Sequence, residues 1–494
     1  MNIEVPTLYC FYPYSLSGLA KGWKKITGME ALISREFRLR SEGGVTSKVN
    51  IICDGEPDDF VVFPEADLSI QPVNVGNDPS MKREVINRWF DALWAIIHPA
   101  AFTSPSLKGE LAKAVYPESN ATPGSFKRVE EHIQRRRIEA NADPDVYFAD
   151  CFEEQVKNLP EQARVNWIEV FFTECILRCK QQKKEFSSQS LHSFLVVPDN
   201  LIKTSEGRRI LKAYSCADKV YLQTDAYRRR LERQLLAMSL PIPELHRFDL
   251  PPDSASLRRF LRRSEQEIAL SSLDNNQQVM LKDAMSSKGK VPHRFVCPDR
   301  LDPIKGIHVV LQAVDSFLSK KKRSLEELRN SYRFYFVTDY YTRYPEFDES
   351  LAWHRYAEWL RTNLIPQVQK RWPGIVFFAD NISDRFVWSQ LLVDAHCISG
   401  GIQEGLGLAV QEGLIANQEM GLGRSVIIGD GAGFALQARE DGFGDLCLFP
   451  EAGNVEAYVE SLESVTQTPD KVHLRNTSEM VERFIEPHNH RLLP

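Results

Sequence analysis

Residues 299–306, DRLDPIKG, decide the fold class of this 494-residue chain. They follow a short apolar run at residues 294–297 that is typical of a buried strand, and they lead into a helical pattern over residues 306–319. A strand that passes through a short loop into a helix is the repeating unit of a parallel α/β sheet. Because such sheets bind ligands at the carboxyl ends of their strands, we expect this loop to face a ligand.

The loop carries two cationic side chains, Arg300 and Lys305. At a junction between a strand and a helix, an Arg fork and a compact Lys charge together suit a diphosphate group. A purely structural interpretation fits equally well, in which the two cations pair with the nearby Asp299 and Asp302. A second segment is needed to decide between them.

That second segment is residues 400–412, GGIQEGLGLAVQE, which has the same strand–loop–helix pattern. Its glycines let the backbone approach a ligand, and N–H groups at a helix start near Leu408 favour anions. Glu404 and Glu412 supply carboxylates that can accept hydrogen bonds from sugar hydroxyls. Alone, the segment also fits a glycine-rich turn with ordinary acidic residues at a helix start. Together with the cationic loop, it indicates a nucleotide-diphosphate site.

Farther out, strands alternate with helices over two long stretches of the chain. These stretches cover residues 165–238 and 293–465, and prolines cluster in the junction at 239–292. The pattern predicts two doubly wound α/β halves that bind a ligand in the cleft between the carboxyl ends of their sheets. Residues 102–146 are polar and rich in Pro, Ser and Arg, and we expect them to form an insertion.

Composition and charge exclude several classes of protein. Apolar residues make up 43 % of the chain and charged residues 26 %, as in ordinary folded proteins. The net charge of −6 disfavours non-specific nucleic-acid binding. No apolar run reaches the roughly 18 residues of a membrane span, and the first residues lack a secretory-signal pattern. We therefore expect a cytoplasmic protein with no membrane or nucleic-acid partner.

The cysteines point to a reducing compartment. There are nine, and only Cys175 and Cys179 lie close together, at the spacing of one helix face. No pair-plus-pair spacing typical of zinc occurs. We expect reduced cysteines that serve as small core residues, and we expect neither a metal nor a cofactor.

Both motif segments resemble those of the trehalose-6-phosphate synthase family of retaining glycosyltransferases. DRLDPIKG is similar to that family's DRLD-x-x-KG, and EGLGLAVQE is similar to its DGMNLVAKE and to the EGFGLP-x-x-E box of the wider GT-B enzymes. Residues 17–19 (SGL), 221–224 (YLQT) and 427–434 (IIGDGAGF) resemble its Gly-Gly-Leu, GFQT and VLSEFAGA segments, in the same order. The resemblance covers most of residues 190–470, and the first 190 residues more loosely.

The resemblance implies a GT-B fold, an α/β fold in which two Rossmann-like doubly wound domains face a cleft. The donor would be a UDP-, GDP- or ADP-sugar, bound by the second domain. The expected parts are an acceptor-side domain at 1–245, a connector at 246–292, a nucleotide-sugar-binding domain at 293–470, and a C-terminal segment at 471–494 that packs back on the first domain.

For the donor, the resemblance implies a role for each matching residue. Arg300 and Lys305 would hold the diphosphate, and with Glu404 they form the expected catalytic set. Glu404 would bind hydroxyls of the donor sugar, and Glu412 would bind the nucleotide ribose. The remaining expected contacts are the backbone of Gly407, Leu408 and Ala409 against the phosphate and sugar, and Asn381 and Ile382 beside the base.

On the acceptor side, the sequence departs from the family. The family's N-terminal Ser-Asn-Arg, whose Arg grips an acceptor phosphate, is replaced by residues 10–13 (CFYP), and the histidine of its HIPFP segment aligns with Val196. Its HDYHL box has no clear counterpart. Glucose 6-phosphate is therefore not the expected acceptor. The candidates for acceptor contact are Ser17, Gly18, Glu174 and His192.

Aromatic side chains stand where the family has its polar loop: Tyr9, Phe11, Tyr12 and Tyr14. Their faces suit a flat or partly apolar acceptor. They are equally compatible with filling the core around the first strand.

The sequence thus predicts a metal-independent retaining glycosyltransferase with a small-molecule acceptor. Three alternatives stay open: a pseudo-glycosyltransferase that couples a nucleotide-activated cyclitol to an amine, an ordinary trehalose-6-phosphate synthase, and a non-catalytic regulatory relative. The presence of the donor residues disfavours the last of these. The oligomeric state is open, a homo-oligomer included.

Overall fold

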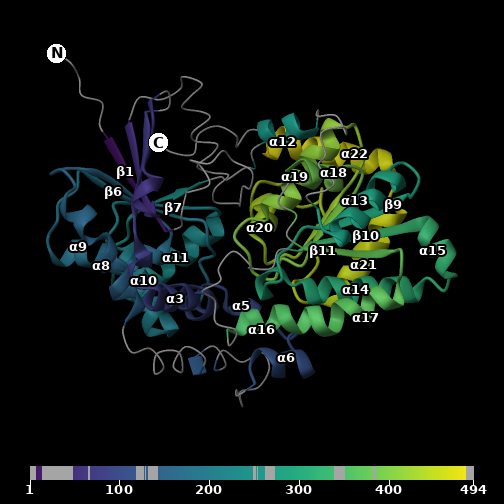
Figure 1. Ribbon diagram of the computed structural model, residues 1–494, viewed down its shortest axis with the longest axis horizontal. Coiled ribbons are helices and arrows are strands. Elements are labelled where there is room, and N and C mark those ends of the chain that lie inside the picture. The colour runs from purple at the N-terminus through teal and green to yellow at the C-terminus, as the bar shows by residue number, and fades with distance from the viewer. Residues whose placement is uncertain are drawn as a thin grey trace.

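Two β-sheets, each flanked by helices, lie side by side in the computed structural model of the chain (Figure 1). This is the two-domain, Rossmann-like α/β architecture that the sequence predicts. The structure describes residues 7–13, 48–64, 67–117, 127, 130–131, 143–248, 252, 254–261, 273–338, 351–380, 382 and 385–485.

The first sheet has eight strands in the order β3-β4-β2-β1-β5-β6-β7-β8. β3 runs antiparallel to β4, and every other neighbouring pair is parallel. The chain starts in the middle of the sheet and adds strands on both sides, which makes the sheet doubly wound. The strands are Thr7–Tyr12 (β1), Lys48–Asp54 (β2), Val61–Phe63 (β3), Leu68–Val73 (β4), Arg164–Ile168 (β5), Ser188–Ser193 (β6), Lys219–Leu222 (β7) and Glu244–Arg247 (β8).

One face of this sheet packs on an aromatic core. Phe11 of β1 stacks on Trp167 of β5 with ring centroids 4.4 Å apart, and Phe148, Phe152 and Phe172 surround them. Phe11 is buried in this core, and Tyr12 is buried in the cluster on the opposite face of the sheet, which matches the core-filling interpretation of these aromatic residues. Tyr14 lies outside the described residues. The helices of this half are Pro79–Arg88 (α3), Trp94–Ile97 (α4), Pro144–Lys157 (α8), Thr173–Gln181 (α9), Ser205–Tyr214 (α10) and Asp225–Ala237 (α11).

The second sheet has five parallel strands in the order β11-β10-β9-β12-β13. They are His293–Cys297 (β9), Tyr332–Thr338 (β10), Val376–Asp380 (β11), His396–Ser399 (β12) and Val426–Ile428 (β13). Its helices include Ser254–Leu261 (α12), Asn275–Ser287 (α13), Ile307–Lys320 (α14), Leu325–Ser331 (α15), Arg385–Leu392 (α18), Leu408–Glu419 (α19), Gly433–Glu440 (α20) and Val455–Gln467 (α21).

The helical segment between β10 and β11 is interrupted. It forms α16 (Ala352–Trp359), a π-helical turn at Leu360–Leu364, and α17 (Ile365–Arg371). Pro366 follows the turn and has no N–H group for a regular helical hydrogen bond, which accounts for the irregular turn at this point.

The segment that follows α4 joins the two halves. Helices α5 (Pro99–Phe102) and α6 (Gly109–Val115) come from the first half, yet Figure 1 shows α6 beside α16 of the second. The Oγ of Ser106 lies 2.8 Å from Nε2 of the buried His308, whose Nδ1 lies 2.8 Å from the Tyr356 hydroxyl. Asp91 accepts a hydrogen bond of 3.0 Å from the Ala352 N–H. The start of the expected insertion at 102–146 is thus a buried contact between the halves.

A second contact joins the halves at the N-terminus of α11. The carboxylate of Glu440 in α20 accepts hydrogen bonds from the backbone N–H groups of Asp225 and Ala226, at 3.0 and 2.6 Å. Beside it, both guanidinium NH2 groups of Arg247 donate to the carboxylate of Asp441. A carboxylate from one half therefore caps a helix of the other.

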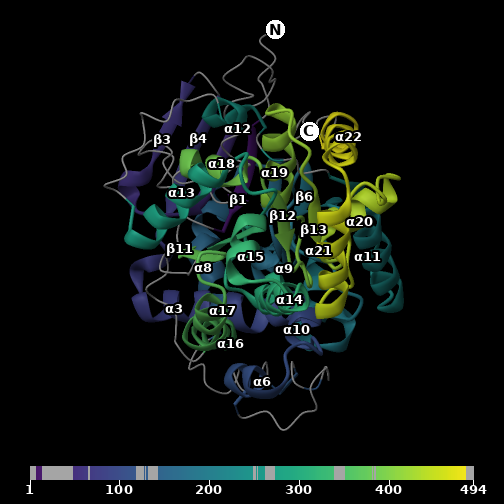
Figure 2. The ribbon, with the colours of Figure 1, turned by 90° about the vertical axis from the view of Figure 1, so that its right-hand side faces the viewer.

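The C-terminal segment packs on the second half as far as it is described. After α22 (Asp470–Glu479), the side chains of Met480, Val481, Phe484 and Ile485 are buried, and Phe484 meets Phe434 and Phe443 at 5.8 and 5.3 Å between ring centroids. Figure 2 shows α22 near α19 and α20. The expected return to the first domain is thus not seen for residues 471–485, and residues 486–494 lie outside the described part. Among the described residues, no helix combines the length and apolar character that a membrane crossing needs.

Candidate functional site

The two motif segments meet because they follow neighbouring strands. Residues 299–306 follow β9, residues 400–407 follow β12, and these two strands pair in parallel. Backbone hydrogen bonds join the loops directly: the Ile402 N–H donates to the Ile304 carbonyl at 2.9 Å. The carboxyl ends of the two strands thus bring both motifs to one edge of the sheet, as the sequence predicts.

Glycine is required where the loops touch. Gly306 has φ +63°, and a Cβ at this position would lie 2.8 Å from the Ile402 side chain. At Gly400, a Cβ would lie 2.2 Å from the Lys305 carbonyl oxygen. Both contacts are shorter than any side chain tolerates, so the glycines allow one backbone to lie on the other.

Lys305 and Glu404 form a buried ion pair between the two loops. Lys305 Nζ also lies 3.6 Å from Asp299 Oδ1. Burial lowers the pKa of Lys305 and raises that of Asp299, and the attraction between them opposes both shifts. The sequence identifies both Lys305 and Glu404 but does not show that they pair.

Glu404 keeps one oxygen without a partner. Its Oε2 meets Lys305, whereas its Oε1 is buried and makes no hydrogen bond with any residue that the structure describes. A Cβ on Gly407, which has φ +75° and precedes α19, would lie 2.8 Å from this Oε1. An acceptor oxygen without its hydrogen bond costs about 1–3 kcal/mol in a buried site. The arrangement therefore leaves an acceptor for a ligand hydroxyl beside the helix start.

Arg300 lies at the rim of this site, and its side chain is 36 % exposed. One of its guanidinium nitrogens lies 3.5 Å from Asp302 Oδ2, and Asp302 also caps the short helix Pro303–Lys305 by accepting from the Ile304 N–H at 3.0 Å. The alternative in which the two cations pair with acidic residues of their own loop is thus partly correct, because Arg300 approaches Asp302 and Lys305 approaches Asp299. The exposed position of Arg300 nevertheless lets it meet an anion in the cleft.

Glu412 is buried in α19 and oriented by an aromatic residue that the sequence did not single out. The indole N–H of Trp388 in α18 donates to Glu412 Oε2 at 2.7 Å. Leu408 and Ala409 form the first turn of α19 and are half-buried. Ile382 is half-buried after β11, and Asn381 lies outside the described residues.

His98 is a site residue that sequence analysis missed. It is fully buried between α4 and α5, and its Nδ1 lies 2.8 Å from the carbonyl oxygen of Gln403, the residue before Glu404. The Ala100 N–H donates to the Gln403 side chain at 2.6 Å. The first half therefore holds the donor loop of the second by a backbone and a side-chain contact. The only signal in the sequence is a His-Pro pair that ends an apolar run.

His98 is neutral. Burial, with the positive charges of Arg300 and Lys305, lowers the pKa of its imidazole to about 3. Because the Gln403 carbonyl can only accept, Nδ1 carries the hydrogen, and Nε2 is then an acceptor. That Nε2 has no hydrogen-bond partner among the described residues.

We expect replacement of His98 by alanine to lower the stability of the fold by about 2–4 kcal/mol, because it opens a cavity and leaves the Gln403 carbonyl unpaired. His98→Asn, which can still donate to that carbonyl, should lose about half as much. Chemical denaturation of both variants at pH 7.5 measures the difference. Equal losses would show that the hydrogen bond to Gln403 contributes nothing.

The first half meets the donor loop at the ends of β6 and β7. A Cβ at Gly405 would lie 2.3 Å from the Phe194 carbonyl oxygen, so the loop backbone touches the first half directly. The Tyr227 hydroxyl lies 3.5 Å from the Glu404 carbonyl. The two halves are therefore in direct contact at this loop.

Glu169 is a second missed residue, at the carboxyl end of β5. It is fully buried with φ +73°, and it accepts hydrogen bonds from the Phe194 N–H at 2.6 Å and the Ser193 hydroxyl at 3.4 Å. Burial raises the pKa of its carboxyl group to about 8, against the effect of these hydrogen bonds. A carboxyl group next to the loop contact thus stays protonated at neutral pH.

The fold as a whole matches solved structures. A synthase described as OtsA aligns with a TM-score of 0.70 at 11 % identity, over 98 % of this chain and 96 % of that one. The UDP-forming trehalose-phosphate synthase of Burkholderia xenovorans, in complex with glucose 6-phosphate, gives 0.68 at 12 % identity over 98 % and 96 %. The Escherichia coli protein with UDP-2-fluoro glucose gives 0.67 at 9 % over 98 % and 99 %.

The chain has the GT-B fold of the trehalose-6-phosphate synthases. No protein-family model matches the sequence, and no curated protein does. The likeness to the trehalose-6-phosphate synthases is therefore one of fold, and it includes the first 190 residues, where the sequence resemblance is loose.

The candidate acceptor residues that the structure describes lie in different parts of the first half. The carboxylate of Glu174 is held by Arg178 and Arg209 on α9 and α10, on the side away from the second half (Figure 1). His192 lies on β6 and stacks on Tyr221, with ring centroids 4.2 Å apart. Ser17 and Gly18 lie outside the described residues. The structure thus brings the expected donor residues Lys305 and Glu404 together, and it does not bring together the two acceptor candidates that it describes, Glu174 and His192.

Proposed function

We propose that the protein is a retaining glycosyltransferase that transfers a sugar from a nucleotide-diphosphate sugar to a small acceptor. One observation carries this proposal: Lys305 and Glu404 form a buried ion pair at the start of α19, with Glu404 Oε1 unpartnered among the described residues. A cation and an unsatisfied acceptor side by side suit a phosphate linked to a sugar. The Escherichia coli neighbour was solved with UDP-2-fluoro glucose bound, which supports a donor of this class.

The leaving diphosphate would lie between the cationic loop and α19. Arg300 at the rim and Lys305 below supply positive side chains, and the first N–H groups of α19, at Leu408 and Ala409, point along the helix dipole. Glu404 Oε1 would accept a hydroxyl of the donor sugar, and Glu412, oriented by Trp388, would accept from the ribose.

In the proposed reaction, the bond between the sugar carbon C1 and the phosphate oxygen breaks as the acceptor oxygen bonds to C1 from the same face. The acceptor proton passes to the leaving phosphate oxygen, so atoms and charge balance. The main contribution to the activation free energy is the negative charge that builds on the diphosphate in the transition state. Preorganised cations and N–H groups stabilise such charge. Arg300 and Lys305 would supply this stabilisation themselves, so we propose a metal-independent enzyme whose activity persists in excess EDTA.

We further propose an acceptor other than glucose 6-phosphate. Residues 10–13 of the first strand and its end are buried, and none of them is a cation that could hold a phosphate. The Burkholderia xenovorans neighbour was solved in complex with glucose 6-phosphate, so glucose 6-phosphate is the acceptor to test first. The assay combines UDP-, GDP- or ADP-glucose with glucose 6-phosphate. We expect no phosphorylated disaccharide, and efficient formation of trehalose 6-phosphate would overturn the acceptor proposal while leaving the glycosyltransferase proposal intact.

The donor proposal is tested by thermal unfolding with UDP-, GDP- and ADP-sugars. A ligand that binds the native state alone stabilises it by RT ln(1 + [L]/Kd), about 2.7 kcal/mol at 100 times Kd. We expect one nucleotide class to raise the melting temperature strongly. If no nucleotide sugar shifts the wild type at millimolar concentration, the proposed donor site is wrong.

Variants of Glu404 and Glu412 should distinguish binding of the nucleotide from binding of the donor sugar. Glu412→Gln is expected to weaken nucleotide and nucleotide-sugar alike, because its proposed partner is the ribose. Glu404→Gln is expected to weaken only the sugar-bearing ligand, since removing the partner of Lys305 leaves that cation for the diphosphate. Each lost charge-assisted hydrogen bond corresponds to roughly tenfold or more in Kd. Titration calorimetry that finds the same loss of free nucleotide in both variants contradicts this division.

A further inference from the structure

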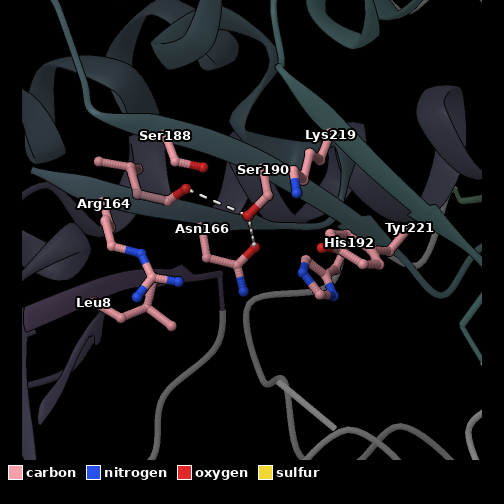
Figure 3. A pocket seen from close by; sticks show the side chains of 9 residues that line it. Leu8, Arg164, Asn166, Ser188, Ser190, His192, Lys219 and Tyr221 are labelled. Atoms are coloured by element: carbon pink, nitrogen blue, oxygen red, sulfur yellow. Dashed lines mark hydrogen bonds between the residues drawn. The ribbon is translucent and has the colours of Figure 1, made fainter. Parts of the chain in front are cut away.

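Three adjacent strands of the first sheet carry polar side chains on one face (Figure 3). The side chains belong to Arg164 and Asn166 on β5, Ser188, Ser190 and His192 on β6, and Lys219 and Tyr221 on β7. A parallel sheet is normally covered on both faces, and its strands are accordingly apolar. On β2 and β4 the same face is indeed apolar, with Val49, Ile51, Leu68 and Ile70. The polar patch is thus a local exception that packing does not require.

These residues line a cavity of about 80 Å³, which Leu8 of β1 completes on one side. A single water needs roughly 15 Å³ by the same measure, so the cavity is large enough for a group of several atoms. Strand pairing places Arg164 level with Ser188, and Lys219 level with Ser190. Since β5 and β7 lie two strand spacings apart, about 10 Å, their long side chains both reach a group above β6.

The side chains that line the cavity carry a net positive charge within the described part of the chain. The Arg164 side chain makes no ion pair or hydrogen bond with any residue that the structure describes, and Lys219 is paired with Glu244 at 3.6 Å. No Asp or Glu among the described residues lines the cavity. Burial and the Glu244 carboxylate raise the pKa of Tyr221, whereas the charges of Lys219 and Arg164 lower it, so both cations act on the same space, with Glu244 opposing them.

His192 adds an unsatisfied buried group. It is 1 % exposed, its ring stacks on Tyr221, and its Nε2 has no hydrogen-bond partner in the residues that the structure places. Beside it, the Ser190 hydroxyl donates to Asn166 Oδ1 at 3.1 Å, and the Asn166 amide nitrogen has only a weak contact, 4.0 Å, with the Cys10 sulfur. The cavity therefore offers cations and neutral polar groups that a small anion would satisfy.

The cavity is separate from the donor site. A cluster of Phe248 and Leu406, with Phe194 and Leu408 packed on it, lies between the His192 end of the cavity and the start of α19. Arg164 and Ser188 stand at the opposite ends of their strands, four or more residues from the carboxyl edge. At about 3.3 Å per residue, that is more than roughly 13 Å from the cleft.

We propose that this cavity is a second anion site, which binds the phosphate group of orthophosphate or of a small phosphorylated metabolite. Arg164 holds the phosphate as a fork and Lys219 as a point charge. The hydroxyls of Ser188 and Ser190 complete the contacts. The proposal does not depend on the glycosyltransferase reaction.

The test measures phosphate binding with the donor site weakened. In an Arg300→Gln background, which should remain folded because Arg300 is partly exposed, calorimetry is run with orthophosphate, glucose 6-phosphate and uncharged glucose. We expect the two phosphates to bind and glucose not to bind; tighter binding of the sugar phosphate identifies a metabolite, and equal binding identifies orthophosphate. Adding Arg164→Gln should weaken binding at least about tenfold, the scale of one charge-assisted hydrogen bond.

Two further variants keep the result unambiguous. Lys212→Gln removes an equal charge from an exposed position on α10 and should leave phosphate affinity unchanged. Asn166→Asp places a carboxylate of the same shape in the cavity and should abolish binding, and its melting temperature shows whether it folds. The proposal is overturned if no phosphate binds in the Arg300→Gln background, or if Arg164→Gln and Lys212→Gln behave alike.

Discussion

Turnover is expected to fall by about 100-fold or more when either Arg300 or Lys305 is replaced with alanine. Both cations belong to the loop after β9, and the proposed mechanism uses them to stabilise charge on the leaving diphosphate. Removing one preorganised group of this kind typically costs about 2.7–4 kcal/mol in the activation free energy. Initial rates with the donor identified by thermal unfolding, at saturating acceptor, measure the effect.

The two variants differ in their effect on folding. Lys305→Ala leaves the buried carboxylates of Asp299 and Glu404 without their cation, so we expect it also to lose about 3–5 kcal/mol of stability. Arg300 lies at the rim, so Arg300→Ala should remain folded and gives the clean measurement. The control is Lys320→Ala, which replaces an exposed lysine at the far end of α14, the helix into which the loop leads. Normal turnover in both Arg300→Ala and Lys305→Ala would reject the diphosphate assignment.

The second large effect concerns Glu169 and pH. Because burial raises the pKa of its carboxyl group to about 8, from 4.5 in the unfolded chain, the folded state holds a proton that the unfolded state releases between these values. This contribution to stability is present below pH 4.5 and is lost as pH rises toward 8, by up to about 1.4 kcal/mol per pH unit. Glu169→Gln mimics the protonated form and should remove this loss.

The measurement is the free energy of unfolding by denaturant from pH 6 to pH 9. The difference between Glu169→Gln and the wild type should grow in favour of the variant up to about pH 8 and stay constant above it. Glu153→Gln, which removes a carboxylate from the exposed side of α8, controls for a general change in charge. Parallel curves for Glu169→Gln and the wild type would show that Glu169 is ionised in the folded protein.

Local patterns were sufficient to predict that the two motif loops meet. Each motif loop follows an apolar run and precedes a helical pattern, and parallel strands expose all their carboxyl ends at one edge of the sheet. The meeting of residues 299–306 with residues 400–407 follows from that rule. What the pattern could not show is the pairing of Lys305 with Glu404, since other acidic residues in both loops were equally plausible partners.

The acceptor half could not be predicted, because its contacts join distant parts of the chain without a motif. His98 touches Gln403, 305 residues farther along the sequence. Glu169 is distinguished by burial and a positive φ, neither of which sequence composition reveals. Glu174 carries the right chemistry for an acceptor contact, but the arginines of α9 and α10 hold its carboxylate on another side of the domain.

The carboxylate of Glu440 has a consequence for the release of product. It satisfies the first N–H groups of α11 across the boundary between the halves, and Arg247 binds Asp441 next to it. In the proposed glycosyltransferase, a nucleotide bound beside residues 400–407 would leave as the halves part, and this motion would expose these charges to water and to salt. The exit step is then governed by electrostatics far from the reacting atoms, so a rise in ionic strength should accelerate departure of the nucleotide without changing the chemistry.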